Sequence, residues 1–436
     1  MKNNTIIACS LAALLLTACE PYTENLFDKP AGERIAESLQ TYRELLTAQS
    51  NGWLVEYYPE KTQRYGGFNL FFRFENEQVT VRSEIDPAVS ATSAWSTGTD
   101  MGPTINFNTY NEVLHPNFSD PAIPFGGGLG LNREGDYEFV VMSGSETEFI
   151  LMGKKTKNTI RMTPFPANLS WEGYCQSLKA MYQNVNAPAY KMTIGGKEIS
   201  IVKSIRANAF TLKTNSETVF APFIVTLSGI KFYEPITISG ETLQVFNYHE
   251  GVDKIISEKG NAEISFVLTS LSNYFIENIR WADWYLKTDN IGPGYLPAWN
   301  TAKANLEKYD LKLLYMWLGI LADGYPTGIS FAVYDEQEDA AWWGTYAYDF
   351  VAVGEDRVKF VHNSALTTSD GINADVFAPM MRNFTITLFN GKTFTLEPDV
   401  DVSNPKNMAN IKEIKLIDAS YPNDWIKVSL DSVIWP

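Results

Sequence analysis

The sequence predicts an α+β protein that is predominantly antiparallel β, built as two diverged, related lobes of meander sheets or partly closed barrels. Each lobe is expected to carry one or more covering helices. Two observations predict this class: aromatic and β-branched runs follow one another with short polar turns between them, and helical patterns are few. Consecutive strands joined in this way form antiparallel meanders, whereas parallel sheets need strands that alternate with helices.

The composition indicates a large core and argues against one class of partner. The chain has 436 residues, of which 45% are hydrophobic and 13% aromatic, enough for a large core. It carries 51 acidic residues against 35 Lys and Arg, a formal net charge of −16. Binding to phosphate backbones needs an excess of Lys and Arg, so nucleic acid is not expected as a partner.

The first residues resemble the signal peptide of a bacterial lipoprotein. The apolar run Ile6–Leu16 is too short to span a bilayer, which requires ~20 residues. It ends in Leu16-Thr17-Ala18-Cys19, which resembles a lipobox, the motif whose Cys is acylated and becomes the first residue. We therefore expect a lipoprotein signal peptide over 1–18, lipid at Cys19 and a polar tether over 19–30.

The first β-rich lobe is predicted over 31–270. An amphipathic helix is expected over 31–50 and a second over 168–185, where Cys175 shares a helical face with apolar residues and should be buried and inert. Two hairpins are predicted between these helices. Their strands are 69–74 with 78–82 and 137–142 with 148–152.

The second β-rich lobe is predicted over 271–436. Helices are expected over 296–308, 374–382 and 272–288, and the last of these would carry Trp281, Trp284 and Tyr285. Two strands within 384–396 flank Asn390-Gly391, a dipeptide that strongly favours a two-residue hairpin turn.

A diverged internal repeat would relate the two lobes. Two stretches of the first lobe match two of the second in the same order, Ile105–Glu112 with Ile329–Glu336 and Tyr137–Val140 with Tyr348–Val351. Short β patterns also match by chance, so the repeat makes a specific prediction. Tyr110 and Tyr334, and likewise Phe139 and Phe350, should occupy corresponding places.

Several motifs together resemble one family. They are the lipobox, Asn51-Gly52-Trp53, Glu56-Tyr57-Tyr58, Tyr65–Phe68, Phe107–Asn111 and Gly229–Tyr248. In these the chain resembles an uncharacterised cell-envelope lipoprotein family of Bacteroidetes, domain of unknown function 4302. The resemblance implies a location and a lineage, often near SusC/SusD-like uptake systems, and brings no catalytic pattern.

Motifs for common chemistries are incomplete. The three His residues stand in separate segments, so the paired His of a zinc hydrolase are missing. The glycines of 126–130 lack the Lys of a phosphate-binding loop, and Asp399–Ser403 begins like a calcium loop but lacks its later Gly and Glu. We therefore expect no catalytic residue, no metal site and no cofactor.

Aromatic side chains are the candidate ligand contacts. Trp342 and Trp343 should point to opposite faces of a strand, so one is exposed unless both faces are covered. A loop insertion after residue 110 carries Phe118 and Phe125 among Pro and Gly. It would form either a lid that presents these rings to a ligand or a plug that completes the core.

These features favour a lipid-anchored cell-envelope protein that acts as a non-catalytic binding or assembly module. The expected partners are the membrane, through the lipid, and a glycan, a peptide or an envelope protein. The expected membrane is the outer membrane. The sequence does not distinguish its cell-surface face from its periplasmic face. The alternatives are an envelope hydrolase that uses paired carboxylates and a purely structural envelope protein.

Overall fold

The computed structural model describes residues 29–122, 132–204, 207–281, 284–320, 326–364 and 376–430. The predicted signal peptide, Cys19, nearly all of the tether and Phe125 lie outside the described residues. Within the described ranges, no helix combines the length and the apolar character that crossing a bilayer requires.

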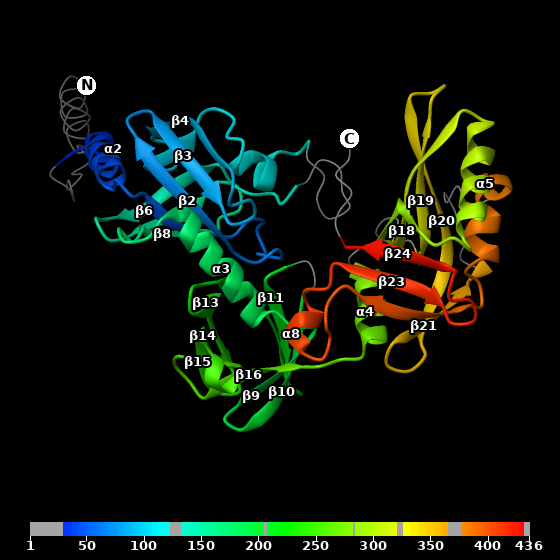
Figure 1. The fold of residues 1–436 in the computed structure, drawn as a ribbon. Helices are drawn as coiled ribbons and strands as arrows, with labels where there is room; N and C mark the ends of the chain where they lie inside the picture. The colour runs from blue at the N-terminus through cyan, green and yellow to red at the C-terminus, as the bar shows by residue number, and fades with distance from the viewer. Residues whose placement is uncertain are drawn as a thin grey trace, which may run out of the picture.

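The described strands form three consecutive eight-stranded barrels, each a closed antiparallel meander (Figure 1). Barrel 1 is followed by barrel 2 and then by barrel 3, from blue through green to red in Figure 1. The strands of barrel 1 are β1 (Trp53–Tyr57), β2 (Phe68–Glu75), β3 (Gln78–Ser83), β4 (Ser90–Gly98), β5 (Thr104–Phe107), β6 (Glu138–Gly144), β7 (Phe149–Gly153) and β8 (Thr159–Pro164).

Barrels 2 and 3 repeat this architecture. The strands of barrel 2 are β9 (Ala189–Ile194), β10 (Lys197–Lys203), β11 (Ala209–Lys213), β12 (Thr218–Val225), β13 (Gly229–Ile238), β14 (Glu241–His249), β15 (Lys254–Ser257) and β16 (Ala262–Val267). The strands of barrel 3 are β17 (Trp284–Ile291), β18 (Leu311–Ile320), β19 (Thr327–Asp335), β20 (Ala340–Ala352), β21 (Arg357–His362), β22 (Thr393–Pro398), β23 (Glu413–Asp418) and β24 (Trp425–Ser429).

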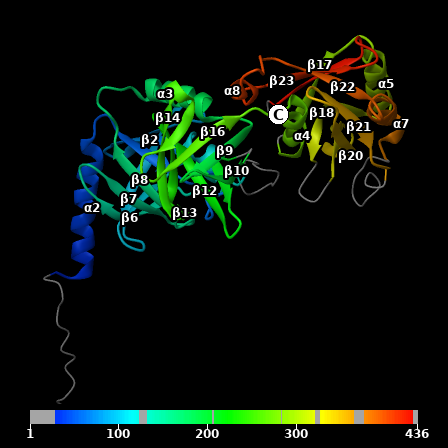
Figure 2. The same ribbon diagram turned by 90° about the horizontal axis from the view of Figure 1, so that it is seen from below.

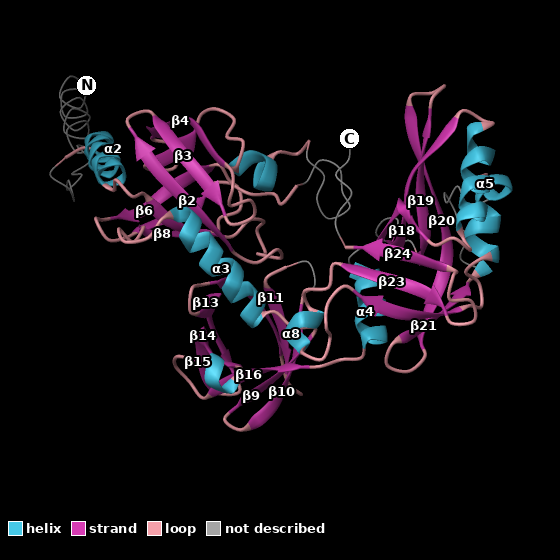
Figure 3. Cartoon of the chain, viewed as in Figure 1, coloured by secondary structure: helices cyan, strands magenta, loops and turns pink. Residues whose placement is uncertain are grey.

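Helix α2 precedes barrel 1, α3 and α4 connect consecutive barrels, and the remaining helices lie between strands of a single barrel (Figure 3). Helix α3 leads from barrel 1 into barrel 2, and its N-terminus is capped because the Ser170 hydroxyl accepts a hydrogen bond from the Gly173 amide at 3.0 Å. The helices are α2 (Ala31–Ala48), η1 (His115–Ser119), α3 (Trp171–Val185), η2 (Glu250–Val252), α4 (Leu271–Trp281), α5 (Leu296–Glu307), α7 (Ala378–Arg382), η3 (Asn383–Thr387) and α8 (Pro405–Met408).

Each barrel closes by pairing its first strand with its last, and the pairing begins at the barrel's entry and exit. In barrel 1, Trp53 pairs with Pro164, and in barrel 2, Ala189 pairs with Val267. In barrel 3, Tyr285 pairs with Ser429. Closure satisfies the backbone groups that an open sheet would leave at its two edges.

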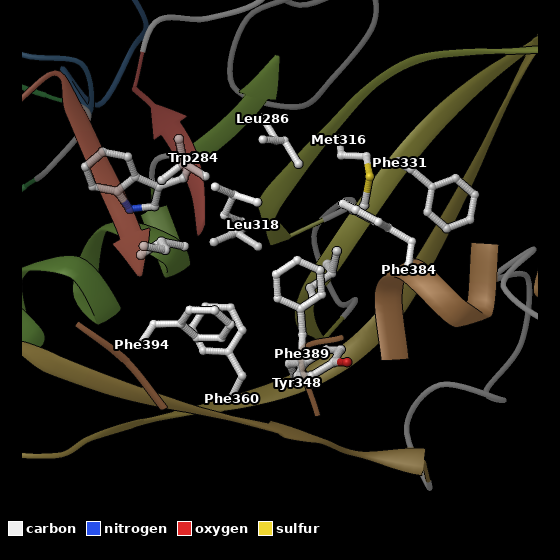
Figure 4. Packing of buried hydrophobic residues seen from close by; sticks show 14 of the residues in the cluster. Trp284, Leu286, Met316, Leu318, Phe331, Tyr348, Phe360, Phe384, Phe389 and Phe394 are labelled. Carbon is white, nitrogen blue, oxygen red and sulfur yellow. The ribbon is translucent and has the colours of Figure 1, made fainter. Parts of the chain in front are cut away.

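Side chains fill the barrel interiors. In barrel 1, the buried Trp53, Tyr57, Phe72 and Trp95 belong to one continuous core. In barrel 3, rings from several strands meet rings from η3 and its following turn, including Phe384 and Phe389 (Figure 4). Alternation along each strand explains this, since every second residue faces inward and those positions are apolar.

Barrel 3 contacts barrel 2 through α8, which lies near β16 in the view of Figure 2. The Lys406 ammonium lies 2.5 Å from an Asp253 carboxylate oxygen and donates a hydrogen bond to the Tyr248 hydroxyl at 2.9 Å. It also lies over the rings of Tyr248 and Phe266, at 4.9 and 5.4 Å from their centroids. This contact is therefore polar and centred on a single cation.

The structure confirms the predicted class, α+β and predominantly antiparallel, but the meanders predicted as sheets or partly closed barrels are closed. The predicted first lobe, 31–270, contains two barrels, and the second, 271–436, contains one. The boundary near 270 lies between the end of β16 and the start of α4. The additional division follows β8, where α3 begins at Trp171.

The residue correspondences of the predicted repeat are wrong. Phe139 lies in the sixth strand of barrel 1, whereas Phe350 lies in the fourth strand of barrel 3. Tyr110 lies in the loop after β5, whereas Tyr334 lies within β19. Every antiparallel meander repeats similar hairpins, so short matches between hairpins do not identify equivalent strands.

Two local predictions in the second lobe are also wrong. The helix predicted over 272–288 ends at Trp281, and Trp284 is the first residue of β17. The strand predicted over 384–388 is largely helical, in η3, where the Phe384 ring is buried. In both places the aromatic residues are compatible with a helix and with a strand. Packing in the barrel determines which of the two forms.

We predict that Phe118→Ala lowers the free energy of unfolding of barrel 1 by about 3–5 kcal/mol, because a fully buried ring leaves a cavity. Denaturant titration followed by Trp fluorescence measures the loss. The matched control is Phe220→Ala at an exposed position, where a change of about 0.5 kcal/mol or less is expected. Equal losses in the two variants would contradict the core role of Phe118.

Candidate functional site

A groove of about 430 Å³ lies between barrels 1 and 2. Barrel 1 contributes side chains from the turns after β1 and β7, and barrel 2 contributes side chains from β12 and β13. We call it the inter-barrel groove, and its principal lining residues are Lys61, Gln63, Lys157, Asn158, Phe220, Tyr233 and Glu234.

A buried carboxylate shapes the turn on the barrel 1 wall. Asp136 accepts hydrogen bonds from the backbone amides of Lys155, at 2.5 Å, and Thr156, at 3.2 Å, and from the Thr156 hydroxyl. Lys157, the next residue, has a φ of 66°, a left-handed conformation that a side chain rarely adopts without such support. The turn therefore holds Lys157 and Asn158 in fixed places on the groove wall.

Asn158 joins this turn to the loop after β1. Its amide nitrogen donates to the carbonyls of Tyr58, at 2.9 Å, and Glu60, at 2.6 Å. Its amide oxygen accepts from the Gln63 side chain at 2.5 Å. Two amide side chains are thus fixed against each other on one wall.

The barrel 2 wall presents two aromatic rings beside a break in the strand pairing. The register between β13 and β14 shifts between Lys231 and Ile236, and Tyr233 lies within this irregular stretch. The Tyr233 ring packs on Tyr58 with centroids 4.7 Å apart, and its hydroxyl accepts a hydrogen bond from the Thr159 amide at 2.7 Å. Phe220, in β12, is 45% exposed.

The two walls are held together by backbone contacts that leave no room for a side chain. The Gly67 amide donates to the Phe223 carbonyl at 2.9 Å, and the Asn208 amide donates to the Tyr65 carbonyl at 3.3 Å. Gly66 has a φ of 75°, and a Cβ there would lie 2.3 Å from the Asn208 carbonyl oxygen. The Lys231 ammonium also pairs with Glu56 at 2.8 Å across the same contact.

The charges around the groove differ from those of the chain as a whole. Lys61 and Lys157 are exposed on the barrel 1 side, and Glu234 is exposed on the barrel 2 side. Behind Tyr233, burial and the nearby Glu56 carboxylate raise the pKa of Tyr58 well above its ordinary value, so its hydroxyl is neutral. The groove thus combines two ammonium groups, two amides and two aromatic rings.

The groove lining was compared with the requirements of two kinds of hydrolytic site, paired carboxylates and a metal centre. Glycoside hydrolysis needs two carboxyl groups at a defined separation, and among the described lining residues Glu234 is the single acid. Within the part of the chain that the structure describes, no group of three or more His, Cys, Asp or Glu side chains is arranged to hold a metal ion.

The structure separates the ligand contacts that the sequence predicts. Trp342 and Trp343 lie in β20 of barrel 3, on opposite faces, and outside the groove. Trp342 is 39% exposed and Trp343 is half-buried. Cys19 and Phe125 lie outside the described residues.

Phe118 is corrected from a ligand contact to a core residue. It lies in η1 with no exposed surface, and its ring contacts those of Tyr57 and Phe68, with centroids 5.0 and 5.2 Å away. The insertion was predicted to form either a lid or a plug. The part that contains Phe118 forms a plug, because its side chain completes the core. A phenylalanine in a loop has no periodic neighbours that would reveal the side it faces, and barrel 1 supplies an apolar interior.

The groove residues could not be predicted from the sequence, because they come from two separate barrels. One feature of the sequence could have pointed to the barrel 2 wall. Pro222 and Pro235 interrupt the strand patterns of β12 and β13, and proline inside a strand marks an edge or a bulge. Both prolines line the groove.

The fold defines a protein of serial antiparallel barrels with a groove between the first two. The model of the domain of unknown function DUF4302 matches residues 23–250, more than half of the chain. The chain belongs to this family, as its sequence motifs predict. The match includes every principal lining residue of the groove, so the site lies within the family's own domain.

Other comparisons add no functional argument. No curated protein matches the chain. The chain has 12% identity to a DNA polymerase sliding clamp from Pseudomonas aeruginosa over 91% of this chain and 98% of that chain, with a TM-score of 0.12. It has 8% identity to kievitone hydratase from Nectria haematococca over 89% of this chain and 91% of that chain, also with a TM-score of 0.12. Scores this low support neither a shared fold nor a shared activity.

We predict that Gly66→Ala separates the two walls of the groove, because its Cβ would collide with the Asn208 carbonyl. The matched control is Gly196→Ala, whose φ of 78° is similar but whose Cβ would meet no atom within 4 Å. Gly66→Ala should lower the free energy of unfolding by about 1–3 kcal/mol more than the control does. Equal losses, measured by thermal or denaturant unfolding, would show that this contact does not hold the barrels together.

Proposed function

We propose that this protein is a non-catalytic binding module that holds a short carbohydrate chain in the inter-barrel groove at the cell envelope. The observation that carries the proposal is the exposed Phe220 ring opposite the fixed amide pair of Gln63 and Asn158. The groove volume lies within the ~300–1,000 Å³ range of small-molecule sites.

The chemistry of the groove fits a sugar on both walls. The C–H face of a sugar ring packs on an aromatic ring, and Phe220 and Tyr233 offer such rings. Hydroxyl groups need both donors and acceptors. Lys61 and Lys157 provide donors, and the Gln63 side-chain oxygen provides an acceptor, because the amide hydrogens of Gln63 and Asn158 are already donated within the wall. The aromatic and polar groups lie on opposite walls, as a ligand with apolar and polar faces requires.

A carbohydrate fits better than the other partners considered, a peptide or an envelope protein. Extended peptides commonly bind by adding a strand to an exposed sheet edge. The described strands of barrels 1 and 2 are closed into rings, so such an edge is not offered there. A protein partner would need a much larger contact area than a groove of this size provides.

The location at the envelope rests on the lipobox-like Leu16–Cys19. A lipid on Cys19 would anchor the barrels through a short tether that leads into α2.

We predict that Cys19→Ala abolishes incorporation of a fatty-acid analogue and moves the protein from the membrane fraction to the soluble fraction. Cys175→Ala, at a buried thiol, should keep the label. Full labelling of the Cys19 variant would contradict the anchor.

The binding proposal is tested on the soluble form that lacks residues 1–19. We expect a glycan array to identify an oligosaccharide, and we expect Phe220→Ala to weaken its binding about five- to thirtyfold in calorimetry, since packing of a sugar face on one ring contributes about 1–2 kcal/mol. Tyr309→Ala, at an exposed ring of barrel 3, serves as the control and should bind as the unaltered protein does.

The variant Trp342→Ala distinguishes the groove from barrel 3. Loss of binding in that variant, with Phe220→Ala unaffected, would move the site to β20. An array without any bound glycan would contradict the proposed function and favour a structural role.

A further inference from the structure

Barrels 1 and 2 share a core, whereas barrel 3 has a core of its own. Phe71 of barrel 1 packs in the same buried cluster as α3 and the interior of barrel 2. Among the described residues, the buried cluster of barrel 3 contains none that precedes Leu271. A shared apolar core makes two barrels one rigid unit, whereas domains that meet through a small polar contact are expected to move relative to each other.

The chain passes from barrel 2 to barrel 3 once, over residues 268–270, between the end of β16 and the start of α4. The Leu268 side chain in this linker is 51% exposed, so it is not packed between the barrels. Figures 1 and 2 both show barrel 3 to one side of the other two barrels, with α8 between them. A short linker with an exposed side chain does not by itself fix the orientation of barrel 3.

Barrel 2 carries a site for one cation close to this linker. Its walls are the rings of Tyr248 in β14 and Phe266 in β16, whose centroids are 6.5 Å apart. Its charged group is the Asp253 carboxylate, which accepts a hydrogen bond from the Tyr248 hydroxyl at 3.0 Å. Two ring faces, a hydroxyl oxygen and a carboxylate together suit a protonated amine. We call these three residues the ammonium box.

Lys406 of barrel 3 fills the ammonium box, where the carboxylate, the hydroxyl and both rings hold its ammonium group at the distances given above. The backbone that presents Lys406 is fixed within barrel 3. The Asn404 side chain accepts a hydrogen bond from the Lys406 amide at 2.8 Å, and Met408 is buried in the core of barrel 3. In the described part of the chain, Lys406 makes the one hydrogen bond and the one ion pair that join barrels 2 and 3.

We propose that barrel 3 is a mobile module that Lys406 latches to barrel 2, and that a protonated primary amine from another molecule displaces Lys406 from the ammonium box and releases barrel 3. The Asp253 side chain is 48% exposed, so a competing amine can reach its carboxylate. Lys406 belongs to the same chain, so a free amine must exceed an effective concentration on the order of millimolar. The inference is independent of any ligand in the inter-barrel groove.

Single-molecule energy transfer between dyes on barrels 2 and 3 measures the latch. The dyes are attached at Ser216→Cys and Ala304→Cys, two exposed positions, in the form that lacks residues 1–19 and keeps every described residue. Cys175 is buried and does not take a dye. The latched protein should give one narrow distribution of transfer efficiency. Lys406→Gln should broaden it, because loss of the ion pair and the cation–π contacts lowers the ratio of latched to released protein about ten- to hundredfold.

Two further variants separate the latch from a general effect of charge or of folding. Lys412→Gln removes the charge of an exposed lysine elsewhere in barrel 3 and should leave the distribution narrow. Asp253→Asn alters the ammonium box from the side of barrel 2 and should broaden the distribution as Lys406→Gln does. The double variant should then show no additional change, because both substitutions remove the same contact.

Butylammonium chloride tests whether the ammonium box accepts an amine. At about 10–100 mM, above the effective concentration of Lys406, it should broaden the distribution more than sodium chloride of the same ionic strength does. Both salts screen the ion pair, but only the amine can occupy the box. This difference between the salts should vanish in Lys406→Gln, in which barrel 3 is already released.

The possible outcomes are distinct. A narrow distribution in both Lys406→Gln and Asp253→Asn, or a broad one in the unaltered protein, would overturn the latch. Equal effects of the two salts would overturn the amine site. None of these results depends on whether the inter-barrel groove binds a glycan, so the proposed function and this inference can fail separately.

Discussion

Closure of each meander, by pairing of its first and last strands, is the constraint on which the rest of the structure depends. A closed eight-stranded barrel is narrow, and its inward positions must be filled by side chains. The interiors here are packed with rings such as Trp53 and Phe360, so they serve as cores. The inter-barrel groove accordingly lies outside both cores, where barrels 1 and 2 meet.

The contact between barrels 1 and 2 shows how closely two such rigid bodies can approach. Glycines at 66 and 67 bring the backbone of one barrel against Asn208 and Phe223 of the other. The groove lined by Phe220 and Lys61 lies between the same two barrels. The contact between barrels 2 and 3, centred on Lys406, is more polar and involves no comparable backbone approach among the described residues.

Local patterns predicted much of the secondary structure. The helices over 31–48 and 171–185 follow their apolar periodicity, and the hairpin between β2 and β3 follows its polar turn. The number of barrels could not be predicted in this way, because closure pairs strands as distant as β9 and β16, and no local pattern records that pairing. Trp284 illustrates the same limit, since its place in a strand depends on neighbours far along the chain.

The candidate site was harder to predict than the fold. Trp342 and Phe118 stand out in the sequence as large rings beside charges or prolines, but one lies in barrel 3 and the other within a core. The groove residues do not form a recognisable motif in the sequence. They line one site only because barrels 1 and 2 meet there. Family membership was predictable, because motifs such as Asn51-Gly52-Trp53 are contiguous in the sequence.

The position of each barrel's entry and exit has a mechanical consequence. Trp53 with Pro164, Ala189 with Val267, and Tyr285 with Ser429 each pair at one end of a ladder. Tension applied to the ends of the chain therefore enters and leaves a barrel at the same rung. It breaks the closing hydrogen bonds one after another, as in a zipper, and does not shear the whole ladder at once. Unfolding by heat or denaturant must disrupt the whole core of a barrel. A pulling force instead acts first on the hydrogen bonds between its first and last strands.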